Sequence, residues 1–143
     1  MEREEIKEYL PHREPMLLVD RMDKDENGVV HGEYLVRGDE HFLQGHFPGI
    51  PVVPGVILCE ILGQCSSMLL LEELKGGKIT LYTGLDKVRF KNTVRPGDTV
   101  KVEAVLTNRR ANIFFIDAKG YVDGKLCVSG VLSVALIDNS NMI

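Results

Sequence analysis

The sequence predicts an α+β protein in which one antiparallel sheet curls around a single long central helix. Two strand-like segments precede a helix candidate that is apolar on nearly every face, and four strand-like segments joined by short turns follow it. A helix that is apolar all round has to be covered on most sides, so the sheet is expected to wrap around it. We expect a single domain over residues 1–143.

The first part of the chain is predicted to hold a short helix and a hairpin. Residues 2–9 form a charged helix candidate that ends before Pro11, because proline disfavours helical backbone in the residue before it. The apolar segment 16–19 and the segment 29–36 are the first two predicted strands. The polar stretch between them ends in Asn27-Gly28, a dipeptide that favours a tight hairpin turn.

The segment 38–54 is rich in glycine and proline and is predicted to be irregular. Its apolar residues Phe42, Leu43 and Phe47 are expected to pack against the rest of the protein.

Residues 54–74 are the long helix candidate, which Gly76-Gly77 should end. The four later strands are predicted at residues 79–90, 99–107, 113–122 and 125–137. One sheet around one helix leaves edge strands that need covering, so we expect a homodimer at least.

Composition and charge exclude several classes of protein. The chain carries 17 Lys and Arg against 21 Asp and Glu, a net charge of −4. No nucleic-acid partner is expected, because phosphate contacts supply most of that affinity. Three cysteines without metal-ligand spacing argue against a disulfide framework and a zinc site, and favour the reducing cytoplasm. No signal peptide is predicted, and Glu60 within the most apolar segment argues against a membrane span.

Glu60 is the first candidate catalytic residue, because it is the only charged side chain between His46 and Glu72. A buried carboxylate has to find a partner, become protonated through a raised pKa, or both. Its structural alternative is a carboxylate bonded to a backbone amide or an arginine in the core. His46, in the irregular loop, is by itself more typical of a surface or hydrogen-bonded histidine.

Together, a neutral imidazole and a protonated carboxylic acid facing one apolar cavity can add or remove water on a carbon chain. Glu60 lies roughly 9 Å along the helix from Pro54, at about 1.5 Å per residue. His46 precedes that end by several loop residues, so the two need not meet within one chain. A two-fold dimer would let His46 of one subunit face Glu60 of the other.

Pro54-Gly55 either simply starts the helix or has a second role. The Gly55 N–H lies at the positive end of the helix, where it could hold a carbonyl oxygen and stabilise an enolate-like charge. The other histidines, His12, His31 and His41, are interpreted as structural or exposed, and Cys59 and Cys65 as small core residues.

Residues 86–110 hold seven basic and three acidic side chains, a net of 7 − 3 = +4. A basic face on an acidic protein indicates an anionic partner, and solvated strand edges are the alternative.

These residues resemble the FabZ-type 3-hydroxyacyl-(acyl-carrier-protein) dehydratases over nearly the whole chain. The segments that carry the resemblance are Leu10-Pro11-His12-Arg13, Leu17-Leu18-Val19-Asp20-Arg21, Gln44-Gly45-His46-Phe47-Pro48-Gly49, Pro51, Pro54-Gly55-Val56, Glu60, Gln64, Arg89-Phe90-Lys91 and Pro96-Gly97-Asp98. The resemblance implies the hot-dog fold, active sites shared across a homodimer, and often a hexamer built as a trimer of dimers.

The resemblance also implies the roles of five residues. His46 matches the catalytic histidine and Glu60 the catalytic glutamate, while Gly55 supplies the amide that holds the thioester carbonyl. Gln64 helps to hold the carboxylate, and Phe47 joins the substrate-binding group. Related FabA-type enzymes, which also isomerise the new double bond, carry Asp at the acidic position, so Glu60 favours dehydration without isomerisation.

The implied reaction is dehydration of a (3R)-hydroxyacyl group on acyl carrier protein to the trans-2-enoyl product, in cytoplasmic fatty-acid biosynthesis. No metal or other cofactor is expected, because the phosphopantetheine arm arrives with the substrate. The candidates for docking the carrier protein are Lys87, Lys91, Arg95, Arg109 and Arg110. An acyl thioesterase with the same fold and a non-catalytic acyl-binding module remain as alternatives.

Overall fold

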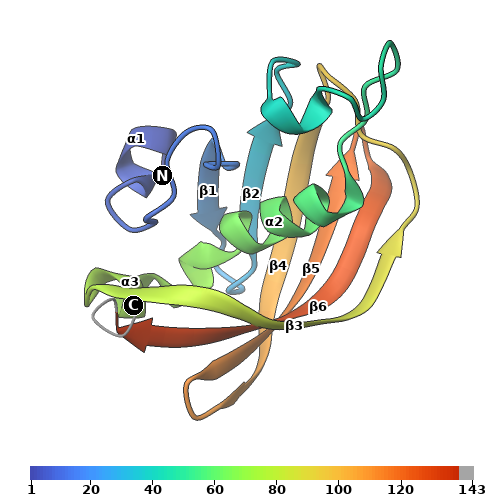
Figure 1. The fold of residues 1–143 in the computed structure, drawn as a ribbon. Helices are drawn as coiled ribbons and strands as arrows, with labels where there is room; N and C mark the ends of the chain where they lie inside the picture. Colours follow the sequence, from blue (N-terminus) through green and yellow to red (C-terminus); the bar gives the residue numbers. More distant parts are fainter. Residues whose placement is uncertain (139–143) are drawn as a thin grey trace.

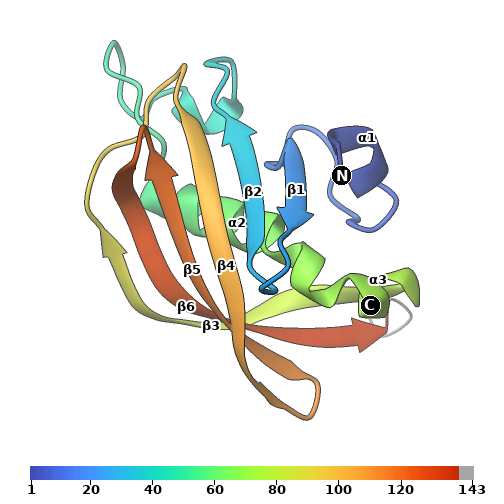
Figure 2. The same cartoon turned by 180° about the vertical axis from the view of Figure 1, so that it is seen from behind.

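A computed structural model describes residues 1–138 of the chain and contains one six-stranded antiparallel sheet that curves around helix α2 (Gly55–Cys65) (Figure 1). The strands follow the order β1-β2-β4-β5-β6-β3 across the sheet. Their bounds are β1 Arg21–Lys24, β2 Val30–Leu35, β3 Lys78–Phe90, β4 Thr99–Arg110, β5 Ile113–Val122 and β6 Lys125–Asp138. The view from behind shows the outer face of the sheet, with α2 on the other side (Figure 2). The predicted α+β arrangement is confirmed.

The four late strands agree closely with the sequence prediction because their turns carry strong local signals. At the β5–β6 hairpin, Asp123 and Gly124 have φ values of 50° and 79°, as a tight two-residue turn requires. The pairing of β3 with β6 is interrupted between Tyr82 and Gly84 and again between Asp86 and Arg89. Such bulges bend a strand, and β3 curves beneath α2 in this way (Figure 1).

The N-terminal elements differ from the prediction. Helix α1 spans only Arg3–Ile6, and the first strand is β1 rather than the apolar segment 16–19. The backbone of that segment bonds to side chains instead of a neighbouring strand. Arg3 donates to the carbonyl oxygens of Leu17 and Val19, both at 3.0 Å. The tight turn is confirmed, with Gly28 at a φ of 81°.

The prediction of a single long helix is also wrong. Helix α2 ends at Cys65 and is followed by a 3₁₀ helix η2 (Ser67–Leu70) and helix α3 (Leu71–Lys75). The axis bends by 41° between residues 55–65 and residues 67–75. Ser66 Oγ donates to the Leu62 carbonyl oxygen at 2.5 Å, and Ser67 Oγ donates to the Gln64 carbonyl oxygen at 2.7 Å. Serine hydroxyls that bond to helix carbonyls bend a helix, which explains the break.

Between residues 1 and 138, no single helix has the length and apolar composition needed to cross a membrane. The bent pair of 55–65 and 67–75 meets both requirements when taken together. In this protein, however, Ile61, Leu62 and Cys65 of that pair are buried in the core.

Gly32 of β2 allows the sheet to approach the end of α2. A Cβ atom added at Gly32 would lie 2.5 Å from Cys65 Cβ and 3.0 Å from the Cys65 carbonyl oxygen. We therefore expect Gly32→Ala to lower the free energy of unfolding by about 1–3 kcal/mol. The measurement is thermal or denaturant unfolding at fixed protein concentration.

Lys101→Ala is the matched control, because its exposed side chain lies on the neighbouring strand β4. This change should stay within about 0.5 kcal/mol of the parent. A Gly32→Ala protein as stable as the parent would show that β2 and α2 are not in close contact.

The loop between η1 (His41–Leu43) and α2 projects beyond the sheet (Figures 1 and 2). Leu43 is buried and Phe42 packs against the core, as predicted. Phe47 is 55% exposed, so the expectation that it packs down is wrong for the single chain. Its ring instead stacks on His46, with 4.3 Å between the ring centroids.

Candidate functional site

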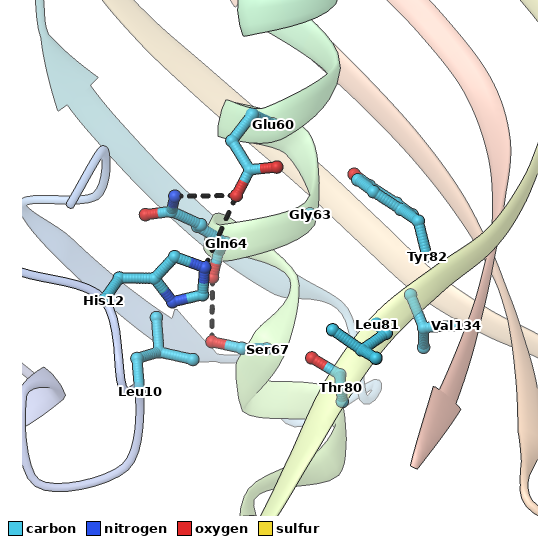
Figure 3. Close-up of a pocket in the computed structure, with 10 residues that line it drawn as sticks. All are labelled: Leu10, His12, Glu60, Gly63, Gln64, Ser67, Thr80, Leu81, Tyr82 and Val134. Atoms are coloured by element: carbon cyan, nitrogen blue, oxygen red, sulfur yellow. Dashed lines mark hydrogen bonds and ion pairs between the residues drawn. The ribbon is translucent and has the colours of Figure 1, made fainter. Parts of the chain in front are cut away.

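Glu60 and Gln64 project from the same face of α2, one helical turn apart, and meet His12 from the segment after α1 (Figure 3). Gln64 Nε2 donates to Glu60 Oε2 at 2.9 Å. His12 Nε2 lies 3.5 Å from the same oxygen. The Glu60 carboxyl is therefore held between an amide and an imidazole.

Gln64 is itself held firmly. Its Oε1 accepts the Leu18 N–H at 2.7 Å, and its Nε2 also donates to the Met16 carbonyl oxygen at 2.8 Å. The side chain is buried, and these bonds use both ends of the amide. Gln64 thus ties the helix to the segment 16–18 and points its remaining hydrogen at Glu60.

The protonation of Glu60 depends on two opposing influences. The neighbouring His12 lowers the pKa of the Glu60 carboxyl, burial raises it, and the Gln64 amide lowers it further. The net pKa lies below the usual value, so the carboxylate is favoured in the free chain. Of the alternatives open to a buried carboxylate, Glu60 therefore shows the first, a partner without a raised pKa. The partners are two side chains rather than a backbone amide or an arginine.

A pocket of about 220 Å³ lies beside Glu60 and has two different walls (Figure 3). The residues that line it are Leu10, His12, Glu60, Gly63, Gln64, Ser67, Thr80, Leu81, Tyr82 and Val134. Polar groups from α2, η2 and the segment after α1 lie on one side, and the mainly apolar side chains of β3 and β6 lie opposite. Such a pocket suits a molecule that carries an alkyl chain and a polar group near the carboxyl.

Tyr82 closes the pocket from β3. Its hydroxyl donates to the Cys59 carbonyl oxygen at 2.5 Å, and burial raises its pKa. A Cβ at position 63 would collide with the Tyr82 hydroxyl, so Gly63 is what allows the ring to reach the helix. The small residue Gly63 on α2 thus lets the large Tyr82 on β3 form part of the wall opposite Glu60.

His46 lies in the projecting loop, and its Nδ1 is 3.0 Å from the Val52 carbonyl oxygen. A carbonyl oxygen only accepts, so Nδ1 carries the hydrogen of this bond. In the neutral ring, Nε2 then keeps a free lone pair. Nε2 is therefore the ring nitrogen of His46 that can accept a proton, and the Phe47 ring stacks against this imidazole.

Gly55 lies in a second pocket, at the N-terminus of α2, with a volume of about 330 Å³. The other residues that line it are Val53, Leu58, Phe90, Lys91, Asn92 and Thr93. Within residues 1–138 the Gly55 N–H donates to no backbone carbonyl. A Cβ at Gly55 would lie 3.0 Å from the Phe90 ring, so glycine also allows this aromatic contact. The amide is thus available for a carbonyl oxygen.

The structure brings only some of the predicted residues together. Glu60 and Gln64 share one pocket, Gly55 lines another, and neither His46 nor Phe47 lines either of them. The pairing of His46 with Glu60 across two subunits therefore stays a prediction.

His12 is the functional candidate that sequence reasoning missed, because it was interpreted as structural or exposed. It lies far from Glu60 in the sequence, and no periodic pattern connects the two. The available signal was its place in the segment Leu10–Arg13, which belongs to the family resemblance. The interpretation holds for His31, which pairs with Asp25 on the surface, and for the exposed His41.

All three cysteines are buried and unpaired, as expected for core residues. In the part of the chain that the structure describes, no three His, Cys, Asp or Glu side chains are grouped so that they could hold a metal ion.

The five candidates for docking the carrier protein form two groups at different places on the sheet. Lys87, Lys91 and Arg95 are exposed near the end of β3, where Lys91 also lines the Gly55 pocket. Arg109 and Arg110 are exposed at the β4–β5 hairpin, at the opposite end of the sheet (Figures 1 and 2).

Comparison with known proteins places these observations in context. Residues 10–130 match the family of FabA-like domains. A 3-hydroxyacyl-(acyl-carrier-protein) dehydratase FabZ from Streptococcus pneumoniae strain CGSP14 is 45% identical over 134 residues, which cover 93% of this chain and 96% of the relative. The FabZ of strain TIGR4 is 45% identical over 132 residues, covering 92% and 94%.

Two solved structures share the fold at low sequence identity. The dehydratase heterocomplex ApeI:P from Xenorhabdus doucetiae matches with a TM-score of 0.79 at 19% identity, covering 96% of this chain and 93% of the other. A phenylacetic acid degradation-related protein from Ralstonia eutropha JMP134 matches with a TM-score of 0.62 at 20% identity, covering 80% and 83%.

Proposed function

Because the chain belongs to the family of FabA-like domains and has the hot-dog fold, we propose that it dehydrates (3R)-hydroxyacyl groups on acyl carrier protein to trans-2-enoyl groups in fatty-acid biosynthesis. The 45% identity to FabZ dehydratases over most of the chain supports this activity. The observation that carries the chemistry is the Glu60 carboxyl, held by Gln64 and His12 at the polar wall of a pocket whose opposite wall is apolar.

The base in this mechanism is His46. The Gly55 N–H donates a hydrogen bond to the thioester carbonyl oxygen and stabilises the charge that develops there, which acidifies C2. Because Nδ1 of His46 carries the ring hydrogen and donates it to the Val52 carbonyl oxygen, Nε2 has a free lone pair. Nε2 then takes the C2 proton. The Phe47 ring beside His46 contacts the thioester end of the substrate.

The acid is Glu60 of the partner subunit, which protonates the departing 3-hydroxyl directly or through a water. An acyl chain that fills the pocket removes water from around Glu60, and this raises the pKa toward the protonated form. The C2–H and C3–O bonds break, the C2–C3 double bond forms and water leaves. His46 then holds the C2 proton, and Glu60 is a carboxylate until solvent returns its proton.

The proposed homodimer is supported by apolar side chains exposed on the single chain. They lie on the edge strand β3, at the start of α2 and in the projecting loop before it: Leu81, Tyr82, Leu85, Phe90, Val56 and Phe47. An uncovered apolar sheet edge favours pairing with a second copy. We further propose three such dimers in a hexamer, working in the cytoplasm.

Acyl carrier protein is the proposed partner, and it brings the phosphopantetheine arm, so that the mechanism uses no further cofactor. The group formed by Lys87, Lys91 and Arg95 is the better docking candidate, because Lys91 lines the Gly55 pocket. Basic side chains there would attract an acidic carrier. Arg109 and Arg110, at the far hairpin, are the weaker candidates.

The test is incubation of the protein with a 3-hydroxyacyl thioester of acyl carrier protein. We expect enoyl absorbance to appear without free thiol. Free thiol would instead identify an acyl thioesterase. Binding without either product would identify a non-catalytic acyl-binding module.

A further inference from the structure

His12 is held at Glu60 by its own short segment of chain. Leu10 is buried in the core. Arg13 Nη1 donates to the carbonyl oxygens of Leu10 and His12 at 2.8 and 2.6 Å, and Arg13 Nη2 donates to that of Lys7 at 2.9 Å. These bonds fix the backbone on both sides of His12. The backbone of His12 is therefore held in place, and its imidazole extends from there to the Glu60 carboxyl.

The two ring nitrogens of His12 have different surroundings. Nε2 faces Glu60 Oε2 at 3.5 Å, whereas Nδ1 is buried and has no hydrogen-bond partner in the described part of the chain. An N–H at Nδ1 would be buried without an acceptor, which is unfavourable. The neutral ring with its hydrogen on Nε2 is thus the form that fits, and this hydrogen points at the carboxyl.

From this geometry we propose that His12 is a positioning residue, a neutral donor that works with Gln64 to hold the Glu60 carboxyl at the pocket wall. The inference rests on the proposed function, because it assigns His12 a task in a reaction carried out by Glu60. The two donors come from different parts of the fold, since Gln64 lies on α2 and His12 on the segment after α1. Gln64 Nε2 donates to Oε2 and His12 Nε2 faces the same oxygen at 3.5 Å, which leaves Oε1 for the substrate hydroxyl or a water.

Three variants test the proposal. His12→Ala should lower kcat by about 10- to 100-fold, the usual effect of removing a group that orients another, with KM nearly unchanged. His12→Gln keeps an N–H donor at a similar reach without being able to carry a proton, and should restore most of kcat. His12→Ala added to Glu60→Gln should cause no further loss, because the group it positions is already disabled.

His31→Ala is the matched control, because His31 also pairs with a carboxylate, Asp25 at 2.9 Å, but lies on the surface away from the pocket. It should leave kcat and KM unchanged. The proposal is overturned if His12→Gln is as slow as His12→Ala, if the His12→Ala loss adds fully to that of Glu60→Gln, or if only KM rises.

Heteronuclear NMR of the His12 ring in the unaltered protein gives a readout that does not depend on folding of a variant or on turnover. We expect the neutral form with hydrogen on Nε2, and finding the hydrogen on Nδ1 would contradict the proposal. Absence of enoyl product from the unaltered protein would count against the proposed function, while this NMR result would still judge the geometry at His12.

Discussion

His46→Ala is expected to lower kcat for dehydration by about 10²- to 10⁴-fold, the usual loss when a positioned base is removed. Val52 holds the Nδ1 side of the ring, so Nε2 is the only nitrogen left to take the C2 proton. The change removes a side chain from a projecting loop outside the core. The oligomer should therefore survive, and the loss should appear in kcat measured by enoyl absorbance.

His41→Ala is the control for this variant, because His41 is an exposed histidine in the preceding turn η1. It should retain activity close to that of the parent. Full activity in the His46→Ala protein would reject His46 as the base.

Glu60→Gln is expected to reduce kcat by a similar factor of about 10² to 10⁴, because the amide keeps the shape of the carboxyl but cannot give up a proton as an acid. Glu72→Gln provides the control, since Glu72 is an exposed glutamate on α3 that pairs with Lys75 on the surface. An active Glu60→Gln protein would remove Glu60 from the mechanism.

The same variant should also change how stability depends on pH. The pKa of Glu60 is lowered in the folded chain, so the carboxylate stabilises the fold above its ordinary pKa, and this contribution is lost as pH falls through the folded value. Glu60→Gln should therefore unfold at a lower temperature than the parent near neutral pH. The difference should close in acid. An equal difference at all pH values would contradict the lowered pKa.

Mixing the two inactive proteins tests whether the site is shared. If His46 of one subunit works with Glu60 of its partner, a mixed dimer of His46→Ala and Glu60→Gln subunits contains one fully intact site. Random reassembly should then restore about a quarter of the parent activity, because half of the dimers are mixed and each has one working site of two. A mixture as inactive as its components would place each site within one chain.

Local signals in the sequence were sufficient for most of the fold. The four late strands were predicted to within a few residues, because Asp123-Gly124 and similar turn residues restrict the backbone regardless of their surroundings. The segment 16–19 was predicted wrongly because its conformation depends on distant residues and not on local signals. Its apolar residues resemble a strand, but its backbone partners are Gln64 and Arg3, which come from elsewhere in the fold.

The amino-acid order alone identified Glu60 as an isolated acid on an apolar helix, together with Gln64 one turn later, because the spacing of residues along a helix is a local property. Only folding in three dimensions placed His12 against Glu60 and lowered the pKa of the Glu60 carboxyl. Folding also separated the candidate docking residues into two groups. These features depend on how the sheet curls and on which distant side chains satisfy each other's hydrogen bonds. Such contacts between segments far apart in the chain leave no periodic trace in the sequence.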